Sequence, residues 1–104
     1  MEQRFVYMTA GSRGEAAAIG RRLVEERLAA CVNILSPMQS IYRWEGRVEE
    51  AEEAVMIAKT TAGRLERLIS RVRELHSYDC PCVVAWEITE GHPDFLDWIS
   101  AETA

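Results

Sequence analysis

The sequence predicts an α+β fold in which a four-stranded antiparallel sheet carries two helices on one face. Two observations support this prediction. Strand-like and helix-like segments follow one another in the order β-α-β-β-α-β and then α, and the two middle strands are joined by a turn of only two residues. Two right-handed β-α-β crossovers joined by a hairpin give the ferredoxin-like sandwich. Here the sandwich is extended by a long hairpin between the second and third strands and by an additional C-terminal helix.

The first strand is expected at residues 4–9, a short apolar run rich in strand-forming residues. The first helix is expected at residues 14–28, because Ser12 and Glu15 have the spacing of a capping box that satisfies free N–H groups at a helix start. Gly20 would weaken this helix by about 1 kcal/mol relative to Ala, and it would allow close packing. One face of the helix is apolar and comprises Ala16, Ile19, Leu23 and Leu28.

The second and third strands, expected at residues 31–44 and 47–59, form a hairpin with Glu45-Gly46 as its turn. Gly46 tolerates the positive φ angle that tight hairpin turns require. Pro37 has no N–H group to donate to a neighbouring strand, so it indicates a bulge or an edge position. We therefore expect the second strand to be interrupted near this residue.

The hairpin is expected to project from the body of the protein. Residues 49–53 are too acidic to be buried, whereas residues 54–58 are apolar enough for a central strand. Tyr42 and Trp44 lie on the projecting part, where a chain of 104 residues can hardly cover them. Two such aromatic residues on an arm indicate a partner surface, most simply another copy of the same chain.

The second helix is the clearest element, because its apolar residues follow the 3.6-residue period of a helix. These residues are Leu65, Leu68, Ile69, Val72 and Leu75. Thr60 or Thr61 can cap the helix, and a loop over residues 76–81 then leads to a strand expected at residues 82–88. Pro93 suits the first turn of a final helix. The apolar face of that helix comprises Phe95, Trp98 and Ile99.

Composition limits the classes of function. The length favours one domain, residues 1–104, and the net charge of −5 disfavours nucleic-acid binding because it offers no large basic field. No apolar run approaches the roughly 18 residues of a membrane span, and the first residues lack the zones of a signal peptide. Three cysteines do not form a disulfide framework, so they suggest reduced thiols. We therefore expect a cytoplasmic protein that binds neither nucleic acid nor membranes.

Several short motifs occur in a fixed order along the chain. They are residues 28–33 (LAACVN), residues 40–46 (SIYRWEG), Lys59-Thr60, His76-Ser77-Tyr78 followed by Pro81, and Trp98. A lone Trp-Glu-Gly would be a weak signal, but the ordered set with these spacings is specific. Together the motifs resemble those of the CutA divalent-cation-tolerance family, and the resemblance covers essentially the whole chain.

This resemblance implies a ferredoxin-like fold and an intertwined homotrimer, related in architecture to PII-type signalling proteins. It also implies a link to copper and other divalent ions, with no established catalytic reaction. On this basis we expect a homotrimeric divalent-cation-tolerance protein that binds Cu or another divalent or soft metal ion and requires none of them for folding. The alternative is a PII-like regulatory module that binds a small molecule or a protein partner in clefts between subunits.

The candidate metal ligands are His76, Cys80 and Cys82, the best soft donors of the chain. The two cysteines would share a face in a strand, so both could reach one ion. The family usually has Pro-Glu where this chain has Pro81-Cys82, which either removes a metal role from this position or tunes it toward softer ions such as Cu(I). In the competing interpretation, Cys82 is a small core residue and Cys80 an incidental loop residue.

The candidate cleft residues are polar or aromatic groups near the ends of elements, namely Tyr42, Trp44, Glu45, Lys59 and Tyr78. Two chains that contribute opposite walls could bring them together in an intersubunit cleft. Tyr42 and Trp44 would share a face, where they would pack against another subunit or form a stacking platform for a planar ligand. The polar members could equally be surface ion pairs or caps. No nucleophile elbow, phosphate loop or dinucleotide fingerprint occurs, so the sequence does not predict an enzyme.

Overall fold

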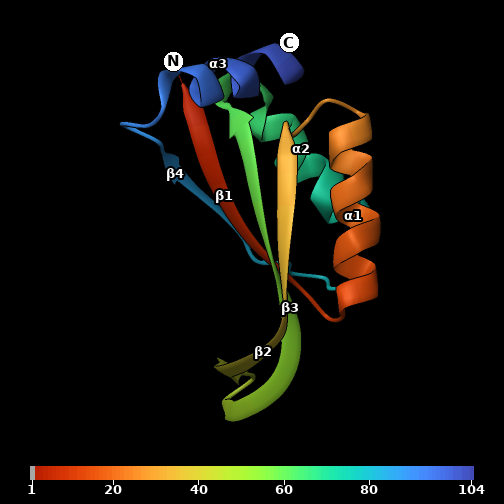
Figure 1. Ribbon diagram of the computed structural model, residues 1–104. Coiled ribbons are helices and arrows are strands. Elements are labelled where there is room, and N and C mark those ends of the chain that lie inside the picture. Colours follow the sequence, from red (N-terminus) through yellow and green to blue (C-terminus); the bar gives the residue numbers. More distant parts are fainter. Residues whose placement is uncertain (1) are drawn as a thin grey trace.

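The computed structural model describes residues 2–104, and its elements follow the predicted order (Figure 1). The strands are β1 (Gln3–Ala10), β2 (Cys31–Trp44), β3 (Arg47–Thr61) and β4 (Val83–Glu87). The helices are α1 (Arg13–Glu25), α2 (Ala62–Leu75) and α3 (Pro93–Glu102). Within the described residues, no helix is long and apolar enough to cross a membrane.

The four strands form one antiparallel sheet in the order β2-β3-β1-β4. α1 and α2 lie on one face of this sheet, and α3 lies at the end where β1 begins (Figure 1). The side-chain amide of Gln3 donates there to the Leu96 carbonyl at 3.2 Å and to the Ser100 hydroxyl at 3.0 Å. This arrangement confirms the predicted ferredoxin-like sandwich with an additional C-terminal helix.

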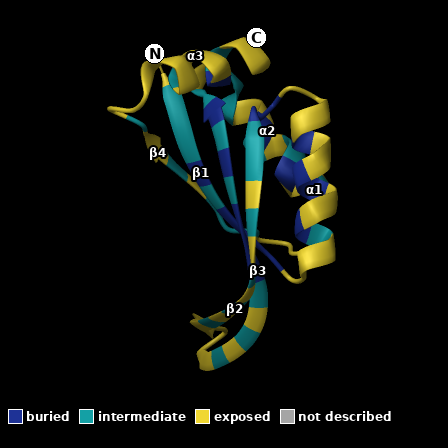
Figure 2. Cartoon of the chain, viewed as in Figure 1, coloured by how far each residue is buried: buried dark blue, intermediate teal, exposed yellow. Residues whose placement is uncertain are grey.

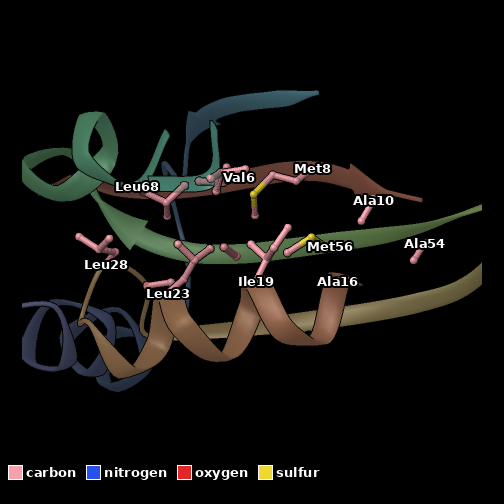
Figure 3. Close-up of a cluster of buried hydrophobic side chains, with 13 residues drawn as sticks. Val6, Met8, Ala10, Ala16, Ile19, Leu23, Leu28, Ala54, Met56 and Leu68 are labelled. Atoms are coloured by element: carbon pink, nitrogen blue, oxygen red, sulfur yellow. The ribbon is translucent and has the colours of Figure 1, made fainter. Parts of the chain in front are cut away.

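The hydrophobic core lies between the sheet and the two helices (Figures 2 and 3). Successive strand residues point to opposite faces, so alternate residues of the two central strands reach the helices. The strands contribute Val6, Met8, Ala10, Ala54, Met56 and Ala58, and the helices contribute Ala16, Ile19, Leu23, Leu68 and Val72. The apolar helix faces predicted from periodicity are therefore confirmed, and the intervening strand residues point to the other face of the sheet.

α1 ends at Glu25, before the predicted end at residue 28. Arg27 adopts a positive φ angle of 60°, and the Leu28 N–H donates to the Leu23 carbonyl at 2.9 Å. The Arg27 N–H donates to the Val24 carbonyl at 3.1 Å, which completes a Schellman motif. This turn folds Leu28 back into the core beside Leu23, so the residue is buried although the helix has ended.

The start of α1 carries half of the predicted capping box. The Ser12 hydroxyl accepts a hydrogen bond from the Glu15 N–H at 3.1 Å, as expected. The Glu15 carboxylate accepts from the Gly11 N–H at 3.2 Å instead of returning to Ser12. Farther along the helix, Gly20 faces β2, and a Cβ atom built on it would lie 3.1 Å from Cγ1 of Val32. The predicted close packing at Gly20 is thus confirmed.

β2 and β3 form the predicted hairpin, with the turn at Glu45-Gly46. Both turn residues have positive φ angles, 50° and 81°, as a two-residue type I′ turn requires. The register of the hairpin shifts between Leu35 and Met38, so the predicted bulge near Pro37 is present. Residues 38–53, the part beyond this bulge, form an arm that projects from the body (Figure 1).

The second half of the chain differs from the predictions in its caps. Thr61 occupies the N-cap position of α2, but its side chain makes no capping hydrogen bond. Its hydroxyl lies 3.3 Å from the Thr103 hydroxyl and so joins α3 to β3. The Thr60 hydroxyl donates to the Leu28 carbonyl at 2.7 Å. Pro93 begins α3 as predicted. On its predicted apolar face, Ile99 is fully buried, whereas Phe95 and Trp98 stay 42% and 39% exposed.

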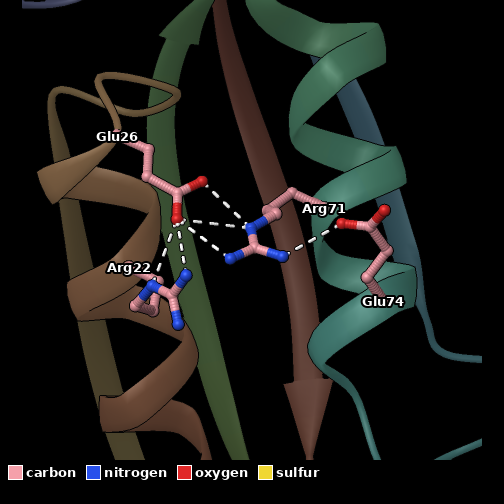
Figure 4. A network of polar contacts seen from close by, with 4 residues as sticks. All are labelled: Arg22, Glu26, Arg71 and Glu74. Carbon is pink, nitrogen blue, oxygen red and sulfur yellow. Dashed lines mark hydrogen bonds and ion pairs between the residues drawn. The ribbon is translucent and has the colours of Figure 1, made fainter.

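The two helices on the sheet are also joined by a surface ion-pair network (Figure 4). The guanidinium of Arg71 on α2 contacts the carboxylate of Glu26 at 3.0 Å and that of Glu74 at 3.0 Å. Arg22 on α1 contacts the same Glu26 carboxylate at 3.0 Å. The hydrogen bond from Arg71, aided by that from Arg22, holds the pKa of Glu26 below its ordinary value. The network orients the surfaces of the two helices, although exposed ion pairs of this kind stabilise a fold only weakly.

Candidate functional site

The face of the sheet opposite α1 and α2 leaves large apolar side chains exposed. Phe5 on β1 pairs with Trp86 on β4, and their rings stack with centroids 4.9 Å apart. Trp86 nevertheless remains 51% exposed, and Leu35 on β2 remains 60% exposed. We call this surface the open face.

Where the open face continues onto the arm, it is hollowed into a groove of about 660 Å³. The groove brings together five of the predicted site residues, namely Tyr42, Trp44, Tyr78, Cys80 and Cys82. Its other lining residues are Tyr7, Thr9, Met38, Gln39, Ser40, Ile41, Glu53 and Asp79. One chain therefore joins aromatic residues predicted for a cleft with both thiols predicted for a metal site.

Two predicted cleft residues lie outside the groove. Glu45 is in the turn at the tip of the arm. Lys59 pairs with Phe5 and with Cys31 in the body of the sheet, and its ammonium group donates to the side-chain carbonyl of Asn33. Neither residue contributes to the groove within one chain.

His76 is held by the backbone on both sides of its ring. Its Nε2 lies 2.8 Å from the Thr9 carbonyl, and because a carbonyl only accepts, this nitrogen carries the proton. Nδ1 accepts a hydrogen bond from the Tyr78 N–H at 3.1 Å, and the side chain is 0% exposed. Either nitrogen would have to give up a backbone hydrogen bond before it could bind a metal.

The thiols of the groove are free and differ in their surroundings. Cys80 is exposed and Cys82 is half-buried. Burial, together with the nearby charge of Glu53, raises the pKa of the Cys82 thiol. Among residues 2–104, no group of three or more His, Cys, Asp and Glu side chains is placed to hold a metal ion. Any ion bound by the two thiols would therefore need a further donor of another type or from another chain.

Two hydrogen bonds fix the loop that follows α2. The Tyr78 hydroxyl donates to Oε2 of Glu53 at 2.6 Å, which ties the loop to the base of the arm. Burial and this hydrogen bond raise the pKa of Tyr78, so its hydroxyl remains a donor. The Glu15 carboxylate accepts from the Ser77 N–H at 2.8 Å. Partial burial of Glu15 opposes ionisation, but the hydrogen bonds from Ser77 and Gly11 prevail and lower its pKa.

Sequence reasoning missed Glu53, Met38 and Tyr7 as groove residues. Glu53 counted only as part of an acidic arm, yet it pairs with Met38 in the first register position beyond the bulge. Met38 Sδ in turn lies 3.7 Å from the Tyr7 hydroxyl, which donates to it. The available signal for Met38 was strand alternation, which puts it on the same face as Tyr42. That signal identifies its partner Glu53 only when the register across the bulge is known.

Comparison with known proteins places the chain in a family. Residues 4–102 match the family model described as CutA1 divalent ion tolerance protein. The chain belongs to this family. The family is named for a tolerance role and is not a known enzyme family.

Two similar proteins align with nearly the whole chain. The divalent-cation tolerance protein CutA of Archaeoglobus fulgidus is 46% identical over 95 residues, which are 91% of this chain and 92% of that protein. The CutA protein of Thermus thermophilus is 45% identical over 101 residues, which are 97% of this chain and 98% of that protein.

Solved structures of CutA proteins have the same fold. The Thermus structure has a TM-score of 0.96 at 44% identity and covers 98% of this chain and 99% of its own. The Archaeoglobus structure, described as a periplasmic divalent cation tolerance protein, has a TM-score of 0.95 at 43% identity and covers 98% of this chain and 99% of its own.

Proposed function

We propose that this family member is a cytoplasmic homotrimer that binds copper or another heavy-metal ion and acts in the response to metal ions. The observation that carries the proposal is the chemistry of the groove, where two cysteines, Cys80 and Cys82, line the same hollow as Met38. Thiolates and thioethers select soft ions such as Cu(I). No Lys, Arg or His occurs among the described lining residues, so no positive side chain of the groove opposes a cation.

Metal binding in this groove would be coupled to proton release. The raised pKa of Cys82 keeps its thiol protonated, and a bound soft ion replaces that proton. The hydrogen bond from the Tyr7 hydroxyl holds the Met38 thioether against another residue of the lining. His76 contributes to this arrangement by holding the loop through its two backbone hydrogen bonds.

The proposed trimer is supported by the surfaces that one chain leaves uncovered. The open face exposes Leu35, Val84 and Trp86, and the arm exposes Tyr42 and Trp44. β2 and β4 form the two edges of the sheet, so each has a row of backbone groups without a strand partner in the sheet. Contact between these different edges of neighbouring chains is heterologous, and such contacts close into a ring when the rotation permits.

Native mass spectrometry of the untagged protein, with and without added copper and zinc, tests both parts of this proposal. We expect a mass of three chains and a stoichiometric shift with copper under reducing conditions. A single-chain mass at micromolar concentration would contradict the trimer. A trimer that takes up no copper would contradict the proposed metal binding but would agree with the proposed trimer.

The size and lining of the groove favour a second candidate, a PII-like module that binds a small molecule or a protein partner between subunits. A volume of about 660 Å³ falls in the range of ordinary ligand pockets. In a trimer, Glu45 and Lys59 of neighbouring chains could complete its walls. A ligand that raises the melting temperature without metal would support this candidate.

A further inference from the structure

The two cysteines of the groove lie on a short segment without regular secondary structure. Cys80 and Cys82 fall within residues 79–82, which belong to no helix or strand. At one end this segment continues into β4 at Val83, which pairs with Met8 on β1. At the other end it is joined to the loop that follows α2. A segment of four residues spans at most about 14 Å, so the positions of its two ends determine where the thiols can lie.

The carboxylate of Glu15 on α1 holds the loop at the first of these ends. Its Oε2 accepts the hydrogen bond from the Ser77 N–H at 2.8 Å, and its Oε1 accepts that from the Gly11 N–H at 3.2 Å. One carboxylate therefore joins the turn before α1 to the loop after α2. Because Glu15 and Ser77 are 62 positions apart in the sequence, this bridge exists only in the folded chain.

The surroundings of the Glu15 carboxylate are tightly packed. A Cβ atom built on Gly11 would lie 3.3 Å from the Tyr78 hydroxyl oxygen and 3.4 Å from Oε1 of Glu15. Partial burial of Glu15 opposes ionisation, but the hydrogen bonds from Ser77 and Gly11 outweigh it and lower the pKa of the carboxyl group. Glu15 is therefore ionised at neutral pH, and each of its two oxygens holds a different segment of the backbone.

The bridge forms within a single chain and requires no residue of a neighbouring one. It starts from α1, which lies on the face of the sheet opposite the open face (Figure 1). An ion held by two thiolates requires both sulfur atoms in a suitable arrangement. Residues that orient metal ligands without touching the ion commonly change metal affinity by about 10–100-fold when they are replaced.

We propose that Glu15 is a positioning residue for the thiols: by holding the loop at Ser77, it sets the arrangement in which Cys80 and Cys82 meet a soft ion. Glu15 does not line the groove, so it acts through the backbone of the loop. The inference rests on the proposed metal function and adds a residue of α1 to the determinants of its site.

Three substitutions in the full-length assembled protein separate the bridge from the charge. Glu15→Gln has one acceptor oxygen in place of two, so it cannot hold both N–H groups through separate oxygens. Glu15→Asp keeps the charge but is shorter by one methylene group, so it cannot span both N–H groups. Glu25→Gln removes the same charge from an exposed position of α1 and is the matched control.

Cu(I) affinity is measured by competition with a calibrated chelator under reducing conditions. The thiolate-to-copper absorption in the ultraviolet shows whether the thiols are the ligands, and native mass confirms that each variant assembles as the wild type does. We expect Glu15→Gln and Glu15→Asp to weaken binding about tenfold and Glu25→Gln to leave it unchanged.

Hydrogen exchange gives a second readout that a purely structural role would not produce. The Ser77 amide should exchange faster in both Glu15 variants, and by a larger factor than the amide of Met56 in the core, which reports on global stability. A general loss of stability would accelerate both amides by the same factor and leave the Cu(I) affinity of the folded protein unchanged.

The other outcomes overturn different claims. A wild-type protein that binds no Cu(I) would refute the metal function and this role of Glu15 with it. Binding by the wild type with the same affinity in both Glu15 variants would refute this inference alone. A loss in Glu15→Gln that is matched by Glu25→Gln, or that is absent in Glu15→Asp, would assign the effect to charge and overturn the positioning role.

Discussion

Gly20 on α1 packs tightly against Val32 on β2, and replacing it by Ala should destabilise the protein. The new Cβ would lie 3.1 Å from Cγ1 and 3.4 Å from Cβ of Val32. Val is β-branched and has little χ1 freedom, so its methyl groups cannot move away without moving the strand. Val32 is also packed against the core, which leaves its side chain little room to shift away from α1.

Two effects of opposite sign determine the size of the change. Ala in the middle of a helix is favoured over Gly by about 1 kcal/mol. Overpacking of a tight contact costs about 1–3 kcal/mol. We therefore expect Gly20→Ala to lower the free energy of unfolding by up to about 2 kcal/mol. Gly63→Ala on α2 meets nothing within 4 Å, so only the favourable effect remains and the variant should be slightly more stable.

Urea denaturation at one fixed protein concentration measures the effect, because the stability of an assembly depends on concentration. Gly20→Ala should cost less in a Val32→Ala background than in the wild type, since the clash disappears once Val32 is truncated. If Gly20→Ala were as stable as Gly63→Ala, the close approach of α1 to β2 would not constrain the helix, and the reasoning would be refuted.

Three further outcomes are expected. Trp44→Ala should weaken trimer formation by about 2 kcal/mol or more, because aromatic residues dominate interfaces, while Arg21→Ala should not; analytical ultracentrifugation across a dilution series compares the two. Cys80→Ser with Cys82→Ser should sharply reduce Cu(I) affinity in competition with a calibrated chelator and leave the trimer intact; unchanged affinity would place the ion elsewhere. Glu15 has a folded-state pKa below its ordinary value of 4.5, so its stabilising effect is present above that value and is lost as the pH falls through the lower folded-state pKa. The stability difference between wild type and Glu15→Gln should therefore shrink on acidification, as followed by urea midpoints at neutral and acidic pH.

The arm shows how far local sequence reasoning reaches. Glu45-Gly46 identified the turn because positive φ angles restrict the residues that fit there, and Pro37 marked the bulge because it has no N–H group. Glu53 was taken as solvated, since its acidic neighbours outweighed any other signal. Its hydrogen bond to Tyr78 joins residues that are 25 positions apart, and no local pattern encodes such a contact.

The candidate site shows the same division. Residue type alone selected the aromatic residues of the arm, Tyr78 and the two thiols after α2, and the structure places these five residues in one groove. Residue type could not reveal that both ring nitrogens of His76 form hydrogen bonds with backbone groups. The Thr9 carbonyl, for example, lies on a strand 67 positions away in the sequence. Residue type also could not show that Lys59 lies outside the groove, because this depends on which residues of β3 lie beyond the bulge.

The sequence by itself determined the order of elements, the apolar helix faces, the turn and the family, because periodicity, turn chemistry and motif spacing act over short distances along the chain. Only the tertiary structure decided the register across the bulge, the meeting of Glu53 with Tyr78, and the gathering of carboxylates and aromatic rings around one hollow. The physical reason is that burial and charge depend on what lies nearby in space. For the arm and the loop after α2, those neighbours are set by how the strands pair and how the helices close over one face of the sheet.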